Sequence, residues 1–109
     1  MALQRQTAVF QALADPTRLA IFERLSRGEA SVTALTQSFA VSQPAVSQHL
    51  GALRRCGLVS HRREGRSMIY RARPEGLEPL QNWLEHYRTF WPERIEKLRA
   101  VLKTHKETT

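Results

Sequence analysis

Short polar side chains and arginines gather in the middle of the sequence, and both types of residue bind nucleic acids. Residues 43–56 carry an apolar stripe of Val46, Leu50 and Leu53, with polar residues at other positions. In a helix these polar residues face away from the stripe, although an ordinary solvent-exposed helix has the same pattern. Gln can form two hydrogen bonds with adenine and Ser can donate or accept, so both suit base edges. We predict DNA contacts from Ser42, Gln43, Pro44, Ser47, Gln48 and Arg55.

A strongly basic segment follows this helix. Residues 58–63 and 67–72 contain β-forming side chains and flank Glu64-Gly65-Arg66, a pattern that predicts a β-hairpin. Arginine suits phosphates and narrow minor grooves. A basic run is usually only a solvated surface, but its place after the polar helix favours a wing that contacts DNA. The predicted contacts in this wing are His61, Arg63 and Arg66.

The elements around these two segments are mostly helical. Apolar residues at helical spacing predict helices over residues 3–13, 17–27, 32–39, 43–56, 74–90 and 92–104. Asp15, Ser31 and Ser42 are N-cap candidates, and Asp15 and Arg18 are spaced for a local ion pair. The predicted fold class is therefore mainly α with a small β-hairpin: a winged helix-turn-helix in which four helices precede the hairpin and two follow it.

Bulk composition agrees with a nucleic-acid partner. The chain has 109 residues, so we expect one domain over residues 1–109. Seventeen Lys and Arg against ten Asp and Glu give a net charge of +7, which favours a polyanion such as DNA or an anionic membrane face. No stretch approaches the ~18 apolar residues of a membrane span, and the N-terminus has no signal-peptide pattern, so no membrane association is predicted.

Other chemistries find little support. The sequence has no Gly-rich phosphate loop, no metal-binding His pair on one helix and no evident Ser-His-Asp arrangement, so we predict neither an enzyme nor a cofactor. The single cysteine, Cys56, cannot form an intrachain disulfide and fits a cytoplasmic location. Neighbouring Arg54 and Arg55 could activate its thiol, but a lone cysteine at a helix end is more often a packing residue.

At four blocks the sequence resembles the ArsR-type family of bacterial repressors. The blocks are residues 12–21, 42–50, 53–59 and 63–70, in the expected order and at the expected separation. The match is close over residues 10–72 and rests on layout in the terminal helices. The resemblance implies a homodimer that represses transcription at an inverted-repeat operator. It also implies that Gln43, Pro44, Ser47 and Gln48 face the major groove, that Arg63 and Arg66 lie at the wing, and that His49 packs beside the core.

The resemblance further implies that the first and the C-terminal helices form the dimer interface. Aromatic residues dominate interface burial, so we expect the cluster of Trp83, Tyr87, Phe90 and Trp91 to be dimer core, with a small-molecule pocket between subunits as the alternative. The predicted interface residues are Phe10, Leu80, Trp83, Leu84, Tyr87, Trp91 and Leu98.

Metal sensing, common in this family, is not carried over by the resemblance. One metal site of the family needs a cysteine pair in the helix before the turn, and residues 31–39 contain none. Another needs carboxylate and imidazole ligands on the last helices, and Glu85, His86 and His105 do not have its usual spacing. No metal site is therefore predicted, and the inducer is unknown. Two other functions stay open. A protein-interaction module would need an acidic or apolar outer face on the 43–56 helix. An RNA-binding protein would favour exposed aromatic residues, and the hairpin offers only Tyr70.

Overall fold

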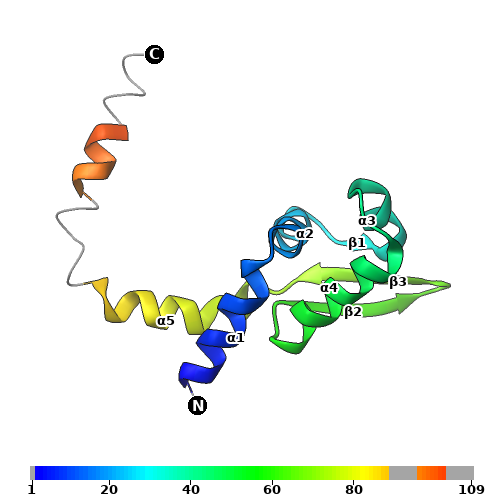
Figure 1. Ribbon diagram of the computed structural model, residues 1–109, viewed down its shortest axis with the longest axis horizontal. Coiled ribbons are helices and arrows are strands. Elements are labelled where there is room, and N and C mark those ends of the chain that lie inside the picture. The colour runs from blue at the N-terminus through cyan, green and yellow to red at the C-terminus, as the bar shows by residue number, and fades with distance from the viewer. Residues whose placement is uncertain (1, 89–95, 103–109) are drawn as a thin grey trace.

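A computed structural model of the chain describes residues 2–88 and 96–102 (Figure 1). Two helices, α1 (Ala2–Ala14) and α2 (Pro16–Ser26), meet at Asp15. The Asp15 carboxylate accepts a hydrogen bond from the backbone N–H of Arg18 at 3.0 Å, and Pro16 fits the first helical position because it has no N–H to satisfy there. The junction predicted from Asp15-Pro16 is confirmed.

The helix-turn-helix consists of α3 (Val32–Ser38) and α4 (Gln43–Arg55). Each helix starts at a serine whose hydroxyl accepts a backbone hydrogen bond: Ser31 from Ala34 at 3.0 Å and Ser42 from Ala45 at 3.3 Å. Phe39 ends α3 in an extended conformation, which leaves only a short connection to α4. These caps fix where the second helix begins, and its start is the end that carries the polar residues.

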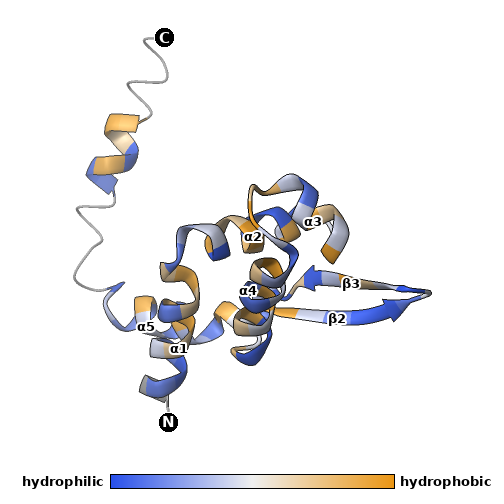
Figure 2. Cartoon of the chain, turned by 45° about the vertical axis from the view of Figure 1, so that its right-hand side comes forward, coloured by the Kyte–Doolittle hydropathy of each residue, from blue (hydrophilic) through white to orange (hydrophobic). Residues whose placement is uncertain are grey.

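The wing is larger than the sequence predicts. Strands β2 (Val59–Glu64) and β3 (Ser67–Ala72) form the expected hairpin, and β1 (Ala30–Ser31) adds a third antiparallel strand in the order β1-β3-β2. A strand of two residues is too short to produce an alternating pattern, so β1 could not be predicted. The turn contains Gly65 at φ +63°, a conformation that glycine adopts without strain. Figure 2 shows β2 as hydrophilic over most of its length.

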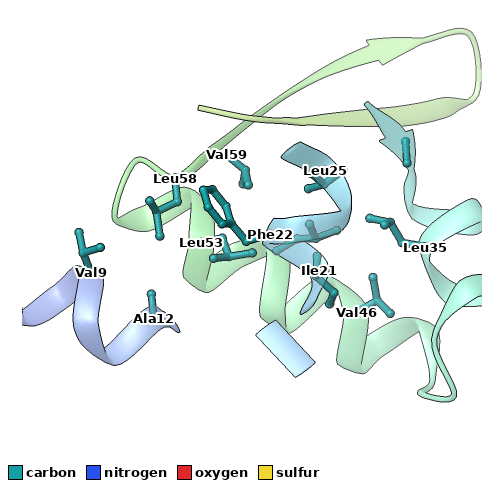
Figure 3. Close-up of a cluster of buried hydrophobic side chains, with 12 residues drawn as sticks. Val9, Ala12, Ile21, Phe22, Leu25, Leu35, Val46, Leu53, Leu58 and Val59 are labelled. Carbon is teal, nitrogen blue, oxygen red and sulfur yellow. The ribbon is translucent and has the colours of Figure 1, made fainter. Parts of the chain in front are cut away.

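One apolar core lies between α1, α2, α3, α4 and the base of the hairpin (Figure 3). Its side chains come from every one of these elements, so α4 and the hairpin are anchored to the same interior. The residues are Val9, Ala12, Ile21, Phe22, Leu25, Ala30, Leu35, Val46, Leu50, Leu53, Leu58 and Val59.

The C-terminal part departs from the predicted helix over residues 74–90. A 3₁₀ turn, η1 (Pro74–Leu77), precedes a shorter helix, α5 (Glu78–His86). The prediction of one continuous helix is wrong. Pro79 has no N–H to donate to the carbonyl oxygen one turn earlier, so it interrupts a helix that starts at Pro74, whereas it is tolerated in the first turn of α5. Residues 96–102 form a further helix, drawn apart from the others in Figure 1. None of the described helices is long and apolar enough to cross a bilayer.

Candidate nucleic-acid interface

The start of α4 presents polar side chains to solvent. The predicted contacts Ser42, Gln43, Pro44, Ser47 and Gln48 are all exposed. The opposite face of the helix carries its three buried residues, each 0% exposed: Val46, Leu50 and Leu53. Because the buried face is fixed in the core, the polar face has a defined direction. Its Gln and Ser side chains have the donors and acceptors that base edges require.

Arg55 extends this polar face to the other end of α4. Its side chain is exposed, and a methyl group placed on Gly51 would lie 3.4 Å from Arg55 Nη1. The guanidinium therefore lies beside the helix one turn before its own Cα, as expected for a long helical side chain.

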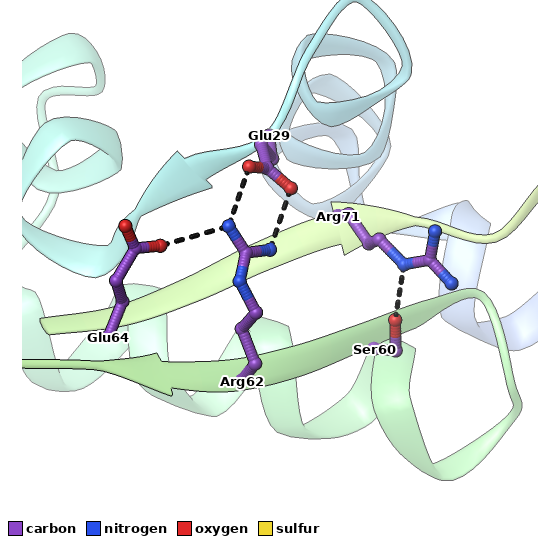
Figure 4. Close-up of polar contacts among 5 residues, drawn as sticks. All are labelled: Glu29, Ser60, Arg62, Glu64 and Arg71. Atoms are coloured by element: carbon purple, nitrogen blue, oxygen red, sulfur yellow. Dashed lines mark hydrogen bonds and ion pairs between the residues drawn. The ribbon is translucent and has the colours of Figure 1, made fainter.

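Arg62, at the middle of β2, is exposed but is held by carboxylates of its own chain. Its guanidinium donates to both carboxylate oxygens of Glu29, at 2.8 Å each, and to Glu64 at 2.9 Å (Figure 4). The hydrogen bonds from Arg62 lower the pKa of Glu29, and those to Glu29 and Glu64 raise the pKa of Arg62. Sequence reasoning did not find Glu29, because it lies 33 residues from Arg62. The bridge ties the loop before β1 to the hairpin.

Two other arginines of this region also have partners. Arg71 Nε donates to Ser60 Oγ at 3.1 Å (Figure 4), and Arg73 Nε pairs with Glu75 at 3.0 Å. By contrast, Arg63 and Arg66 are exposed and form no hydrogen bond or ion pair within the part of the chain that the structure describes. Among the wing arginines, these two are therefore the ones available to an external anion.

His61 lies at the base of the wing, with two neighbours from its own chain. It is half-buried, its ring meets Tyr70 edge to face at a centroid distance of 5.1 Å, and its Nε2 contacts Arg54 Nη1. These contacts connect the end of α4 to β2. His61 is thus less accessible than Arg63 and Arg66.

The pair of Asp15 and Arg18 differs from expectation. No ion pair joins the two side chains among residues 2–88. The Arg18 guanidinium instead lies near the middle of α4, where its Nε donates to His49 Nδ1 at 3.4 Å, while the backbone N–H of Arg18 lowers the pKa of Asp15. The same guanidinium reaches the carbonyl oxygens of Gln11 and Ala12. Arg18 thus connects α1 to α4, where its partner His49 is half-buried.

Cys56 is half-buried at the end of α4. Its thiol donates to the carbonyl oxygen of Leu53 at 3.4 Å, and burial raises its pKa. The neighbouring arginines therefore do not activate it, since the buried environment disfavours the thiolate. The structure favours the packing role over the reactive one.

Large apolar side chains stay exposed on the terminal helices. Phe10 and Trp83 meet edge to face at 5.4 Å, and Trp83 contacts Tyr87 at 5.0 Å, so α1 and α5 share one aromatic surface. The exposed fractions are 45% for Phe10, 36% for Trp83, 60% for Leu84, 38% for Tyr87 and 59% for Leu98. Leu80 instead is half-buried and packs against the core. Trp91 and Phe90 lie outside the described residues.

Metal ligands do not converge in the part of the chain that the structure describes. Among residues 2–88 and 96–102, no group of three or more His, Cys, Asp or Glu side chains could hold a metal ion. Glu85 forms an ion pair with Arg88 at 2.9 Å, and the His86 ring meets Tyr87 edge to face. His105 lies outside the described residues.

A capped helix-turn-helix followed by a basic hairpin beside the second helix defines a winged helix-turn-helix protein, a class of DNA-binding regulators. Residues 15–61 match the family described as "Bacterial regulatory protein, arsR family". The "HTH-type transcriptional regulator Rv2034" of Mycobacterium tuberculosis is 45% identical over 80 residues, which cover 73% of this chain and 75% of that protein. The chain belongs to the ArsR family of bacterial transcriptional regulators.

Two further comparisons agree with this assignment. The "Transcriptional repressor SdpR" of Bacillus subtilis is 30% identical over 79 residues, covering 72% of this chain and 88% of that protein. A solved structure, the "ArsR-like Transcriptional Regulator from Rhodococcus sp. RHA1", superposes with a TM-score of 0.73 at 33% identity, covering 91% of this chain and 93% of that one. The predicted family and fold class are therefore confirmed.

Proposed function

We propose that the protein is a homodimeric repressor that binds an inverted-repeat operator in duplex DNA, as a single domain over residues 1–109. The observation that carries the proposal is the pairing pattern of the wing: Arg63 and Arg66 lack partners among the described residues, while Arg62, Arg71 and Arg73 have them. The start of α4 lies toward the side on which the hairpin extends (Figure 1). One duplex can therefore meet both surfaces.

The two surfaces divide the work of recognition. Gln43, Pro44, Ser47 and Gln48 enter the major groove, where the N-terminal turn of a recognition helix comes closest to base edges. Arg63 and Arg66 contact phosphates or the adjacent minor groove. The flanking residues Ser42, Arg55 and His61 complete the contact surface. With ~6–10 phosphates contacted per dimer, affinity should fall ~10³–10⁵-fold between about 50 and 200 mM salt.

The terminal helices supply the dimer interface. The aromatic surface of Phe10, Trp83 and Tyr87 is contiguous across α1 and α5, and such a surface on a small protein is a typical interaction site. The helix at residues 96–102 exposes Leu98, Val101 and Leu102, each at least 59% exposed. A second copy of the chain can cover both apolar surfaces and would set the two α4 helices about 34–36 Å apart, one turn of DNA.

DNA release does not use the cysteine-pair metal site of the family in this proposal. Residues 31–39 contain no cysteine, and the described residues offer no ligand cluster of three or more.

The division of labour can be tested with two variants. A binding site is first selected from a random pool of duplexes, and binding is followed by fluorescence anisotropy. Gln48→Ala should cost ~1–3 kcal/mol on the selected site and little on scrambled DNA, because it removes base contacts. Arg66→Ala should weaken binding to both duplexes alike and reduce the salt slope by about 1.

Arg27→Gln serves as the control, since it removes an exposed positive charge at the end of α2. Arg27→Gln should leave both the affinity for the two duplexes and the salt slope close to those of the unaltered protein. Identical behaviour of Gln48→Ala and Arg66→Ala on the two duplexes would contradict the proposed roles, and absence of any duplex binding at low salt would contradict the function.

A further inference from the structure

A cleft of about 880 Å³ lies between the first half of α1, the end of α4 and the start of α5. Its volume falls in the range of small-molecule sites, ~300–1,000 Å³. The cleft is distinct from the exposed start of α4 and from the hairpin turn, which supply the proposed DNA contacts other than Arg55 and His61. Its walls come from the recognition helix and from both proposed dimerisation helices.

The charge of the cleft favours an anion. Four arginines line it, against two carboxylates, Glu75 and Glu78; the arginines are Arg5, Arg54, Arg55 and Arg73. Arg73 is neutralised by Glu75 at 3.0 Å, whereas Arg5 and Arg55 form no ion pair among the described residues. Two guanidinium groups without internal partners in one cleft are a suitable site for a carboxylate or a phosphate.

The other walls of the cleft have a different character. Ala8, Cys56 and Pro79 supply apolar surface, and the amides of Gln4 and Asn82 supply hydrogen-bond donors and acceptors. Cleft sites that combine apolar walls with a few convergent polar groups bind organic molecules rather than simple ions. We propose that this cleft binds a small organic anion, with one carboxylate or phosphate group on a short apolar body, and that this anion is the signal that lowers DNA affinity.

The arginine that α1 contributes to the cleft lies on a different side of that helix from the aromatic surface. Successive residues of a helix are about 100° apart, so Arg5 and Phe10 lie about 140° apart around α1. Around α5, Asn82 lies about 100° from Trp83. Gln6 and Pro79 also line the cleft and lie only about 40° from Phe10 and Trp83, so the cleft adjoins the aromatic surface, and Arg5 is the part of it turned away from a partner on that surface.

The cleft can also influence DNA binding, a step that rests on the proposed function. Arg55 lines the cleft and belongs to the exposed face of α4, so an anion that binds Arg55 competes with DNA for the same charge. The cleft also includes Gly57 and Gly76, which approach so closely that a Cβ on Gly76 would lie 2.3 Å from the Gly57 carbonyl oxygen. A ligand at this junction therefore acts where the residue after the end of α4 contacts η1, the turn that leads into α5.

Ligand binding is tested without DNA, by following backbone amide NMR signals of the ¹⁵N-labelled protein. Phenyl phosphate is the probe, and benzoate, inorganic phosphate and benzyl alcohol are compared at constant ionic strength. Phenyl phosphate and benzoate should shift the signals of Arg5, Cys56, Gly57 and Gly76. Arg5→Gln should weaken this binding about tenfold or more, because it removes a charge-assisted hydrogen bond, and Arg27→Gln should not.

Three results would overturn the site. Equal binding of benzyl alcohol would mean that charge is not recognised, and equal binding of inorganic phosphate would mean that the organic body is not. Shifts centred on Trp83 and Leu84 instead of the cleft would place the probe on the aromatic surface. This map is made with the unaltered protein, so it decides the question even if a variant does not fold.

The effect on DNA is measured separately, with the selected duplex. Saturating phenyl phosphate should lower DNA affinity of the unaltered protein, and Arg5→Gln should require a higher concentration for the same effect. Unchanged DNA affinity with an occupied cleft would overturn the regulatory role. Arg5→Gln could also weaken DNA binding in the absence of phenyl phosphate and reduce the salt slope by about 1. In that case the cleft binds DNA phosphates, and the proposal is wrong. Failure of all duplex binding would refute the proposed function and leave the ligand site standing.

Discussion

The body of the molecule and its terminal helices bury their apolar residues to very different extents. In the body, Leu35, Leu50 and Leu53 are 0% exposed. On the terminal helices, Leu84 and Leu98 are 60% and 59% exposed. Leucines thus lie in a fully buried core in one region and on a solvent-exposed surface in the other. The body is complete within one chain, whereas the terminal helices leave an apolar surface that a second chain would cover.

Removing a core side chain tests the completeness of the body and should have the largest effect. Leu53→Ala leaves a cavity where α4 packs on the sheet, so we expect a loss of ~2–5 kcal/mol in the free energy of unfolding. Urea denaturation followed by circular dichroism measures it. Leu84→Ala is the matched control, since the same change at an exposed site should cost little at a protein concentration that keeps the chain monomeric. Equal losses in the two variants would contradict the contrast.

Removing an aromatic side chain from the terminal helices tests whether they form the interface. Trp83→Ala should raise the dimer dissociation constant about 30-fold or more, because buried tryptophans are frequent hot spots of about 2 kcal/mol or above. Sedimentation equilibrium measures this constant. Gln81→Ala, on the same helix but at an exposed polar position, should leave it nearly unchanged. A Trp83→Ala protein that dimerises as tightly as the original would remove the surface from the interface.

The junction between the two regions is tested at Gly76. A Cβ there would lie 2.3 Å from the Gly57 carbonyl oxygen, so Gly76→Ala must displace backbone and should lower stability by ~1–3 kcal/mol. Gly51→Ala is the control, because its Cβ would meet only the end of the Arg55 side chain at 3.4 Å and the helix should gain ~0.5–1 kcal/mol. Thermal unfolding compares the two. A Gly76→Ala protein as stable as Gly51→Ala would show that η1 can move away from α4 freely.

Acid should weaken the body slightly, through the tie between its loop and its wing. Hydrogen bonds from Arg62 hold the pKa of Glu29 below its ordinary value of 4.5. Stability from a lowered pKa is complete above the unfolded-state value and is lost as pH falls through the folded-state value. The melting temperature should therefore drop between about pH 5 and pH 3, and Glu29→Gln should reduce that drop.

Glu23→Gln is the control for this pH experiment, since Glu23 is an exposed carboxylate of α2 with no hydrogen bond or ion pair among the described residues. It should leave the acid profile close to that of the unaltered protein. Identical profiles for Glu29→Gln and the unaltered protein would show that the bridge does not contribute.

Local chemistry made part of this structure predictable. Asp15-Pro16 and Ser42 are cap signals that act within one helical turn, so the starts of α2 and α4 follow from the sequence. The apolar stripe of α4 likewise assigns its buried face. The sequence predicts Arg63 and Arg66 as DNA contacts of the wing. Both lack partners among the described residues, and their contact with DNA stays a prediction.

The remaining features depend on residues that are distant in the sequence. Strand β1 exists because it pairs with β3, and no pattern within Ala30–Ser31 announces it. The partner of Arg62 lies 33 residues away, and that of Arg18 lies 31 residues away at His49. Pro79 is a local signal for the break before α5, but the apolar residues at helical spacing across residues 74–90 predict one continuous helix. The cleft beside Arg5 is likewise formed by three segments that only the fold brings together.

The bridge between Glu29 and Arg62 has an evolutionary consequence. A carboxylate and a guanidinium that bind each other through two hydrogen bonds constrain one another, because replacing Arg62 leaves Glu29 without its partner and replacing Glu29 leaves Arg62 with Glu64 alone. We expect the two positions to change together among homologous proteins, whatever DNA each homologue recognises. Positions 63 and 66 carry no such constraint from within the described chain, so their residues are free to diversify with the target sequence.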